Sequence, residues 1–196
     1  IDLPSNFSHS LTENFLGAKD PTQNGFKNLL GNGNKWGINI DYICQPKPDG
    51  IAQAFILGED FIDKSPCVLI LGDNLFYGNE LTYLLKKANK NIDGSTLFLY
   101  PVSEPSRYGI ATFDKSKKAL NIEEIPAHPK SNYAVTGIYF FDNKVIKYAK
   151  ELKPSKRGEL EIVDLLKKYK SKNQLSADLI GRGGAWLDTG SIDDYY

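Results

Sequence analysis

The sequence is most distinctive for what is scarce in it. Its 196 residues include no methionine, two cysteines and two histidines, and its 24 basic residues balance its 24 acidic ones. A balanced charge gives no argument for binding nucleic acid or an anionic membrane. No apolar run approaches the ~20 residues that span a bilayer, and the first residues lack the basic-then-apolar pattern of a signal peptide. We therefore expect no nucleic-acid or membrane partner.

The few cysteines and histidines narrow the chemistry further. Cys44 and Cys67 do not have Cys-x-x-Cys spacing, and each lies beside apolar residues of an expected strand. They predict buried thiols in a reducing compartment, and hence a cytoplasmic protein. His9 and His128 lie in polar stretches without ligand-type neighbours, so neither receives a role. The sequence also lacks a nucleophile elbow, an HExxH helix and a Walker A loop.

Hydrophobic patterning predicts one α/β domain with a Rossmann-like, doubly wound mixed sheet. Alternating or continuous apolar runs indicate strands, and spacing of three to four residues indicates helices. Strands are expected at 38–43, 68–71, 95–102, 133–141 and 175–180; helices are expected at 51–58, 79–90, 143–150 and 159–170. Because strands and helices alternate, we expect right-handed βαβ units.

Three details refine this expected fold. The uniformly apolar run 68–71 is typical of a parallel strand that is buried on both faces. Asp49 is a suitable N-cap for the helix at 51–58. Residues 108–114 and 119–124 flank a short basic stretch and predict a β-hairpin inserted into the α/β domain.

Two aspartates each end a hydrophobic run. Asp73 follows the run 67–72, and Asp188 follows Trp186 and Leu187. Open α/β sheets bind ligands beyond the carboxyl ends of their strands, and two converging carboxylates could hold the Mg²⁺ of a phosphoryl-transfer enzyme. The alternative is that both are ordinary turn residues, since Gly-Asp-Asn and Asp-Thr-Gly are common turn sequences.

Other polar residues offer binding groups, each with a plainer alternative. The Gln45 amide matches the edge of a nucleobase, and Gly50 would let the backbone approach a planar ligand; otherwise they form a polar loop. Arg157 would suit a phosphate, or it pairs with a neighbouring glutamate as a surface residue. Glu124 could accept hydrogen bonds from sugar hydroxyls, or it is a solvated strand end.

Five segments, taken in order and spacing, resemble glucose-1-phosphate thymidylyltransferases of the sugar nucleotidylyltransferase family. The resemblance extends over residues 26–196. The segments are Gln-Pro-Lys-Pro-Asp-Gly-Ile-Ala-Gln-Ala-Phe (45–55), Leu-Gly-Asp-Asn-Leu-Phe-Tyr-Gly (71–78), Lys-Ser-Asn-Tyr-Ala-Val-Thr-Gly-Ile-Tyr (130–139), Lys-Pro-Ser-Lys-Arg-Gly-Glu-Leu-Glu-Ile (153–162) and Gly-Arg-Gly-Gly-Ala-Trp-Leu-Asp-Thr-Gly (181–190).

The resemblance implies the fold of nucleotide-diphospho-sugar transferases and a specific reaction. The family joins dTTP to glucose 1-phosphate, releases pyrophosphate and makes dTDP-glucose for deoxysugars such as rhamnose. By position, Asp73 and Asp188 would hold Mg²⁺, Gln45 and Gly50 would read the thymine, and Arg157 would meet the sugar phosphate. The glucosyl site would draw on Asn74, Tyr108, Gly109, Glu124, Val135 and Trp186. The family is homotetrameric.

Three departures from the family pattern lead to further expectations. Residues 1–25 contain no Gly-Gly-x-Gly-Thr-Arg loop, Ile125 stands where the family has a phosphate-contacting lysine, and the family's C-terminal helical region is missing after Tyr196. We expect an atypical segment at 1–25 and an incomplete nucleotidyltransferase domain at 26–196. We expect the chain itself to be inactive, and the alternative is a catalytically dead relative that binds sugar nucleotides.

Overall fold

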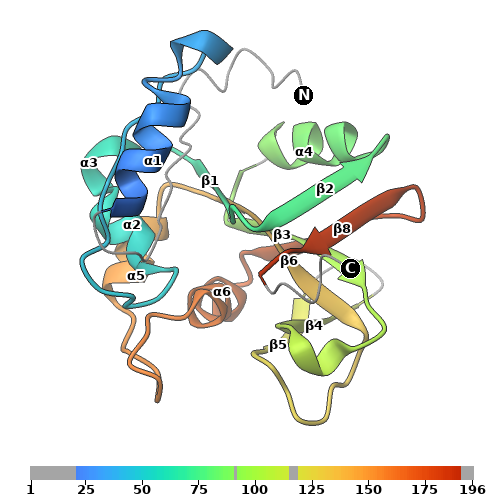
Figure 1. Cartoon of the computed structure of the whole chain (residues 1–196). Helices are drawn as coiled ribbons and strands as arrows, with labels where there is room; N and C mark the ends of the chain where they lie inside the picture. Colours follow the sequence, from blue (N-terminus) through green and yellow to red (C-terminus); the bar gives the residue numbers. More distant parts are fainter. Residues whose placement is uncertain (1–20, 91, 115–118, 191–196) are drawn as a thin grey trace.

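The computed structural model describes residues 21–90, 92–114 and 119–190 of the chain (Figure 1). Within these residues a six-stranded mixed sheet has helices on both sides, and two further strands form a separate small sheet. The strands are β1 (Cys67–Ile70), β2 (Asn74–Gly78), β3 (Ser95–Pro101), β4 (Ile110–Phe113), β5 (Ala119–Glu123), β6 (Tyr133–Phe141), β7 (Leu175–Leu179) and β8 (Gly184–Asp188). The helices are α1 (Pro21–Leu30), α2 (Gln53–Leu57), α3 (Glu59–Ile62), α4 (Leu81–Lys90), α5 (Val145–Lys150) and α6 (Ile162–Ser171).

Strand β6 is the centre of the large sheet. The strand order is β5-β4-β6-β3-β7, and β1 pairs with the far half of β6 on the same edge as β4. Both β1 and β3 are antiparallel to β6, so they run in the same direction on either side of it. Helix α4 connects them, and the pair β3–β7 is parallel. The predicted doubly wound mixed sheet is therefore confirmed.

Both faces of the sheet are covered by helices. Leu97, Leu99 and Tyr139 belong to a buried cluster with side chains of α2, α5 and α6. Phe98 and Phe140, which alternate with them, pack with α4 on the opposite face. This alternation explains why these strands read as continuous apolar runs. None of the described helices has both the length and the apolar character needed to cross a membrane.

Most predicted elements are confirmed, but strand β1 differs from its expectation. The predicted strands at 95–102, 133–141 and 175–180 correspond to β3, β6 and β7, and the inserted hairpin is β4–β5. Strand β1 pairs with β6 in antiparallel register, and Ile70 at its end is 55% exposed. The prediction of a parallel strand buried on both faces was wrong because β1 has β6 as its partner and no described strand on its other edge.

The first predicted strand is also absent from the described part of the chain. Residues 38–43 are not assigned to a strand, because no described strand pairs with them. The alternating pattern could predict a strand face but not a partner. Cys44, expected to be buried beside this strand, is exposed, and Cys67 is only half-buried. The predicted segment at 1–25 lies mostly outside the described residues.

The small sheet brings together two distant parts of the sequence. Strands β2 and β8 pair in antiparallel register, with Asn74 opposite Asp188 and Phe76 opposite Trp186 (Figure 1). The strand β2 was not predicted, since the segment was interpreted as a loop. This pairing brings the ends of two apolar runs, more than a hundred residues apart in the sequence, side by side.

Candidate active site

The two aspartates singled out in the sequence converge on one point. A Cβ atom on Gly190 would lie 3.3 Å from Asp188 Oδ1 and 3.5 Å from Asp73 Oδ2. The Gly190 N–H donates to Asp188 Oδ1 at 3.2 Å, and the Thr189 N–H donates to the Asp73 carbonyl at 2.8 Å. The bond from Thr189 joins the chain after β8 to the chain before β2. We call Asp73, Asp188 and Gly190 the carboxylate corner.

The carboxylate corner fits a divalent cation. Mg²⁺ is commonly held by one or two carboxylates, with water and substrate phosphates as its other ligands. Two carboxylates that lie within 3.5 Å of one point meet this requirement. Across residues 21–90, 92–114 and 119–190, no three His, Cys, Asp or Glu side chains gather as a metal site. A metal at the corner would therefore need substrate oxygens to complete its coordination.

Asn74 holds the carboxylate corner against the main sheet. Its Oδ1 accepts from the Trp186 indole N–H at 2.6 Å and from the Gly137 N–H at 2.9 Å. Its Nδ2 donates to Asp73 Oδ1 at 2.8 Å. A side chain at position 137 would collide with Asn74, since a Cβ there would lie 2.6 Å from Oδ1. Asn74 was predicted to line a sugar site, and its amide also supports Asp73.

Tyr139 links the corner to the rest of the site. Its side chain is buried beneath the surface. Burial, together with the negative charges of Glu124, Asp73 and Asp188, raises the pKa of its phenol. The charges of three carboxylates that are distant in the sequence therefore act on one tyrosine. The sequence analysis missed Tyr139, although period two along β6 puts it on the same face as Val135.

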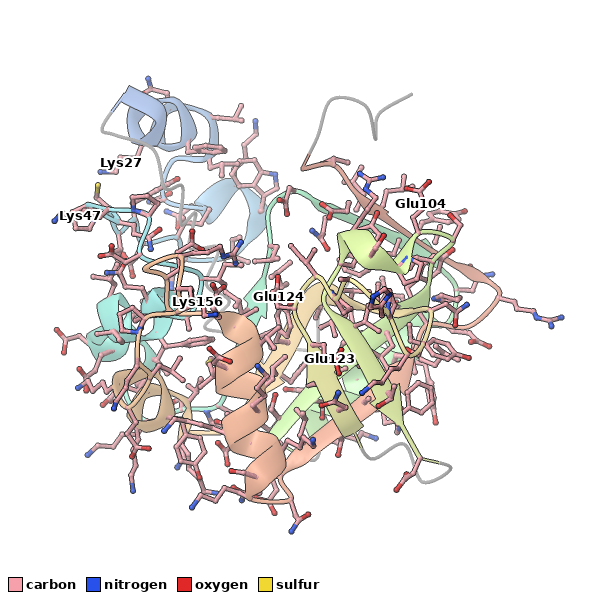
Figure 2. The ribbon with its side chains drawn as sticks, turned by 90° about the horizontal axis from the view of Figure 1, so that it is seen from below. Lys27, Lys47, Glu104, Glu123, Glu124 and Lys156 are labelled. Carbon is pink, nitrogen blue, oxygen red and sulfur yellow. The ribbon has the colours of Figure 1, made fainter. Side chains whose placement is uncertain are left out.

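Glu124 lies at the end of the hairpin, next to Gly109, which was also predicted to belong to the sugar site. Its Oε2 would be 3.4 Å from a Cβ on Gly109, and the Gly109 carbonyl accepts from the Val135 N–H at 2.8 Å. Figure 2 shows Glu124 near the middle of this face, between the hairpin and the loop that carries Lys156. Desolvation and the charge of Glu161 raise the pKa of Glu124 above its ordinary value of 4.5.

The aromatic residues predicted for the sugar site also meet. The rings of Tyr108 and Trp186 are 5.3 Å apart, edge to face, and Tyr100 approaches Trp186 from another side at 6.1 Å. Trp186 is buried, whereas Tyr108 is only half-buried. The structure therefore brings Asn74, Tyr108 and Trp186 together in one group, next to the group of Gly109, Glu124 and Val135.

Arg157 is paired with glutamates, as its plainer alternative predicted. Its Nε and one terminal nitrogen donate to the two oxygens of Glu161 at 3.1 and 2.8 Å, and Glu159 lies 3.8 Å away. The Ser155 hydroxyl donates at 2.7 Å to Glu161 Oε1, the oxygen that also accepts from Arg157 Nε. The contact raises the pKa of Arg157, and the charge of Glu124 adds to the effect. The negative charge of Glu124, a predicted site residue, therefore acts on Arg157.

Gln45 and Gly50 lie in a loop that we call the amide loop (residues 45–53). Gly50 has a φ of +101°, and a Cβ there would be 2.5 Å from the backbone nitrogen and oxygen of Leu160. The Leu160 N–H donates to the Asp49 carbonyl at 2.6 Å, and the Ala52 N–H donates to the Leu160 carbonyl at 3.1 Å. The closest neighbour of Gly50 is thus the backbone of Leu160, three residues after Arg157.

The same contacts correct the prediction for Asp49. Helix α2 begins at Gln53, and its N-cap position, Ala52, makes no side-chain capping bond. Asp49 lies too early in the chain to cap this helix, and its Oδ2 instead accepts from Gln53 Nε2 at 3.0 Å. No role was predicted for Gln53 from the sequence. The only sign of one was its position, four residues after Asp49 and eight after Gln45, which are its hydrogen-bond partners.

Comparisons with known proteins identify the family of the chain. The sequence profile of the family described as nucleotidyl transferase matches residues 5–196. The chain belongs to the nucleotidyl transferase family. Two similar curated relatives are both named glucose-1-phosphate thymidylyltransferase: one from Neisseria meningitidis, 52% identical over 171 residues, and one from Mycolicibacterium smegmatis, 46% identical over 168 residues. These matches cover 87% and 86% of the chain, but only 59% and 58% of the relatives.

Solved structures of the nucleotidyl transferase fold are also similar. A Bacillus anthracis structure, assigned as a glucose-1-phosphate thymidylyltransferase and bound to sucrose, matches with a TM-score of 0.78 and 41% identity. The match covers 88% of this chain and 68% of that one. A UDP-glucose pyrophosphorylase bound to UDP-glucose matches with a TM-score of 0.71 and 24% identity, a likeness that concerns the fold alone.

Proposed function

We propose that the chain is the substrate-binding part of a glucose-1-phosphate thymidylyltransferase. Such an enzyme joins dTTP and glucose 1-phosphate to give dTDP-glucose and pyrophosphate. The convergence of Asp73 and Asp188 at Gly190 carries the proposal, because it supplies the cation site that transfer between phosphates requires. The names of the curated relatives supply the substrates.

Each group of the site then has a role. We assign Asp73 and Asp188 to Mg²⁺, which would neutralise charge on the triphosphate. Gln45 and Gly50 would lie at the thymine, and Arg157 at the phosphate of the sugar. The glucosyl group would lie against the two neighbouring groups described above, which comprise Asn74, Tyr108, Gly109, Glu124, Val135 and Trp186.

The proposed reaction is an in-line displacement at the α-phosphorus of dTTP. A phosphate oxygen of glucose 1-phosphate forms the new P–O bond while the bond to the β-phosphate oxygen breaks, so that pyrophosphate leaves. Arg157 would stabilise the negative charge on the transferring oxygens. Arg157 directs two of its five N–H groups to Glu161, so its remaining N–H groups would meet the incoming phosphate. Glu124 and the paired Asn74 amide would orient the sugar hydroxyls.

Ligand protection tests the proposal directly. With Mg²⁺ present, millimolar dTDP-glucose should raise the unfolding temperature of the chain, because a ligand at about a hundred times its Kd stabilises by about 2.7 kcal/mol. Glucose 1-phosphate alone should protect less, since it lacks the base and one phosphate. No shift with dTDP-glucose would sink the proposal.

A second candidate, a sugar-nucleotide-binding relative without turnover, is favoured by Ile125. This branched residue has a φ of +38° and is 53% exposed beside Glu124. A branched side chain rarely adopts such backbone, and it supplies no charge for a phosphate. Pyrophosphate release from dTTP and glucose 1-phosphate separates the two candidates. Release that appears with Ile125→Lys but not with Ile125→Gln would support the phosphate role of this position, and turnover by the unchanged chain would exclude the second candidate.

The wider setting follows from the same assignment. We propose residues 26–196 as the nucleotidyltransferase domain, with residues 1–25 as an atypical segment before it. The product dTDP-glucose would enter dTDP-rhamnose biosynthesis in the cytoplasm, and the assembled enzyme would be a homotetramer. Sedimentation of the chain with and without dTDP-glucose measures the assembly, and a monomer under both conditions would contradict it.

A further inference from the structure

A relay of side-chain hydrogen bonds runs behind Gln45. Gln45 Nε2 donates to Gln53 Oε1 at 2.6 Å and to the Gly50 carbonyl at 3.2 Å. Gln53 Nε2 in turn donates to Asp49 Oδ2 at 3.0 Å. The relay thus passes from a half-buried carboxylate, through one amide, to the amide predicted to read a base.

The chemistry of Asp49 sets the direction of every bond in the relay. An ionised carboxylate only accepts hydrogen bonds, so Gln53 has to turn its NH₂ group toward Asp49 and its oxygen toward Gln45. Gln45 must then turn its own NH₂ group inward. The Gly50 carbonyl, which also only accepts, fixes the same orientation independently. The choice between the two ends of the Gln45 amide is therefore determined by its partners.

The oxygen of Gln45 is left on the outer side of this arrangement. No donor to Oε1 is found among the residues that the structure describes. The only fully buried side-chain nitrogen or oxygen in those residues that lacks a partner is Ser95 Oγ. Although Gln45 is 9% exposed as a whole, its Oε1 therefore keeps access to the surface. The residue presents a hydrogen-bond acceptor, and its donor is engaged inside the protein.

The backbone holds the base of the relay in place. Leu160 bonds to the Asp49 carbonyl on one side and to the Ala52 N–H on the other, at 2.6 and 3.1 Å. Asp49 and Gln53 are consequently attached to the segment that carries Arg157. A relay with a fixed backbone keeps its polarity when the outer side of Gln45 meets a ligand.

We propose that Asp49 and Gln53 are positioning residues that fix Gln45 as a hydrogen-bond acceptor, so that the site selects bases with a ring N–H. Thymine and uracil carry a hydrogen at N3, which this oxygen accepts. Cytosine has a lone pair at N3, so two acceptors would face each other and neither would be satisfied. This inference rests on the proposed function, because it takes the base to lie at Gln45.

Binding of dUTP and dCTP, which both lack the 5-methyl group, tests the relay. Calorimetric titration with Mg²⁺ present gives the ratio of the two affinities for the unchanged chain and for variants. Gln53→Leu removes both amide bonds while keeping a similar volume, and we expect it to reduce the preference for dUTP about tenfold. Asp49→Asn should reduce this preference less. The new amide can still accept from Gln53, but it can also donate to it, so the orientation of Gln53 is only partly released.

A double variant distinguishes polarity from simple structural damage. In Asp49→Asn with Gln53→Glu, the new amide donates to the new carboxylate, which accepts from Gln45, so the orientation of Gln45 is restored. We expect this variant to regain about the ratio of the unchanged chain. Unfolding temperatures without ligand show that each variant is folded.

Each outcome decides between the two claims. If Gln53→Leu lowers both affinities equally and keeps their ratio, the relay is overturned while the proposed function stands. If the unchanged chain binds dUTP and dCTP equally well, the assigned polarity is wrong although nucleotide binding remains. If it binds neither, the proposed function and the relay fall together.

Discussion

The amide loop is held together by hydrogen bonds among its own side chains, whereas the carboxylate corner brings two like charges toward one point. In the loop, Gln45, Gln53 and Asp49 bond to one another, and Leu160 fixes the backbone behind them. At the corner, the Asp73 and Asp188 oxygens lie within 3.5 Å of one position at Gly190. The loop has a fixed arrangement before a ligand binds and offers it the Gln45 oxygen, whereas the corner gains most from a cation.

The difference separates two tasks in one site. A region that selects between similar ligands needs fixed donors and acceptors, because freedom to rearrange weakens discrimination. A region that binds a metal needs concentrated negative charge, which opposes folding until the cation arrives. We therefore expect changes in the amide loop to alter stability and selectivity, and changes in the corner to alter the response to Mg²⁺.

The largest effect on stability is expected from Gly50→Ala. The added methyl group would lie 2.5 Å from the Leu160 backbone at a φ of +101°, so the loop and its neighbour would have to separate. Strain and overpacking together should reduce the free energy of unfolding by about 3 kcal/mol, measured by urea denaturation. The control at the corner is Gly190→Ala, whose methyl would lie 3.3 Å from Asp188 Oδ1, a tight contact with a side-chain atom and not with backbone, and it should cost less than about 1 kcal/mol. Equal losses would contradict the comparison.

The next largest effect is expected on metal binding, from Asp188→Asn. Replacing one of two carboxylates at the corner should weaken Mg²⁺ binding about a hundredfold, while stability in EDTA should change much less, because asparagine keeps the size and an acceptor oxygen of the side chain. The measurement is the shift of the unfolding temperature on titration with Mg²⁺ and dTDP-glucose. Asp60→Asn, a carboxylate change on the exposed side of helix α3 and outside both regions, is the control. A normal Mg²⁺ response in Asp188→Asn would remove the assigned metal role.

The sequence predicted most strands of the large sheet, but it did not predict β2 and β8, which bring the two aspartates together. Seven apolar residues among the nine of β6 made this strand recognisable, and Asp73 and Asp188 were visible as ends of apolar runs. Their convergence depends on the register of β2 against β8, with Asn74 opposite Asp188, and on distant pairing that local patterns do not encode. Residues 38–43 show the converse, since a strand pattern without a described partner strand did not form a ladder.

The relay in the amide loop was hidden for a different reason. Gln45 was identified because its segment resembles a segment of the family. Gln53 lies in the first turn of α2, where its sequence context is that of an ordinary helix residue. Its bond to Asp49 requires the turn at Gly50, which in turn depends on the approach of Leu160. A relay of side-chain hydrogen bonds depends on tertiary contacts, so composition and periodicity could not predict it.

A moderate effect is expected from Trp186→Phe, which tests how the corner is supported. The change keeps an aromatic ring but removes the indole N–H that donates to Asn74 Oδ1 at 2.6 Å. The Gly137 N–H still bonds to that oxygen, so the loss should be about 1 kcal/mol in the free energy of unfolding. Tyr100→Phe keeps the ring beside Trp186 and should be nearly neutral. If both variants lose stability equally, packing rather than the hydrogen bond supports Asn74.

The smallest effect is expected from Glu124→Gln, between the two regions. Desolvation and the charge of Glu161 raise the pKa of Glu124 in the folded protein above 4.5, so the folded state binds its proton more tightly than the unfolded chain. The stability that this provides is complete below pH 4.5 and is lost as the pH rises through the raised pKa. Glu124→Gln should therefore match the unchanged chain near pH 4 and unfold at most about 2 °C higher at pH 7. Glu123→Gln, which gives up a contact with Lys130 at 3.6 Å, should show no such gain. A higher unfolding temperature for Glu124→Gln at pH 4 than at pH 7, relative to the unchanged chain, would reverse the assigned direction.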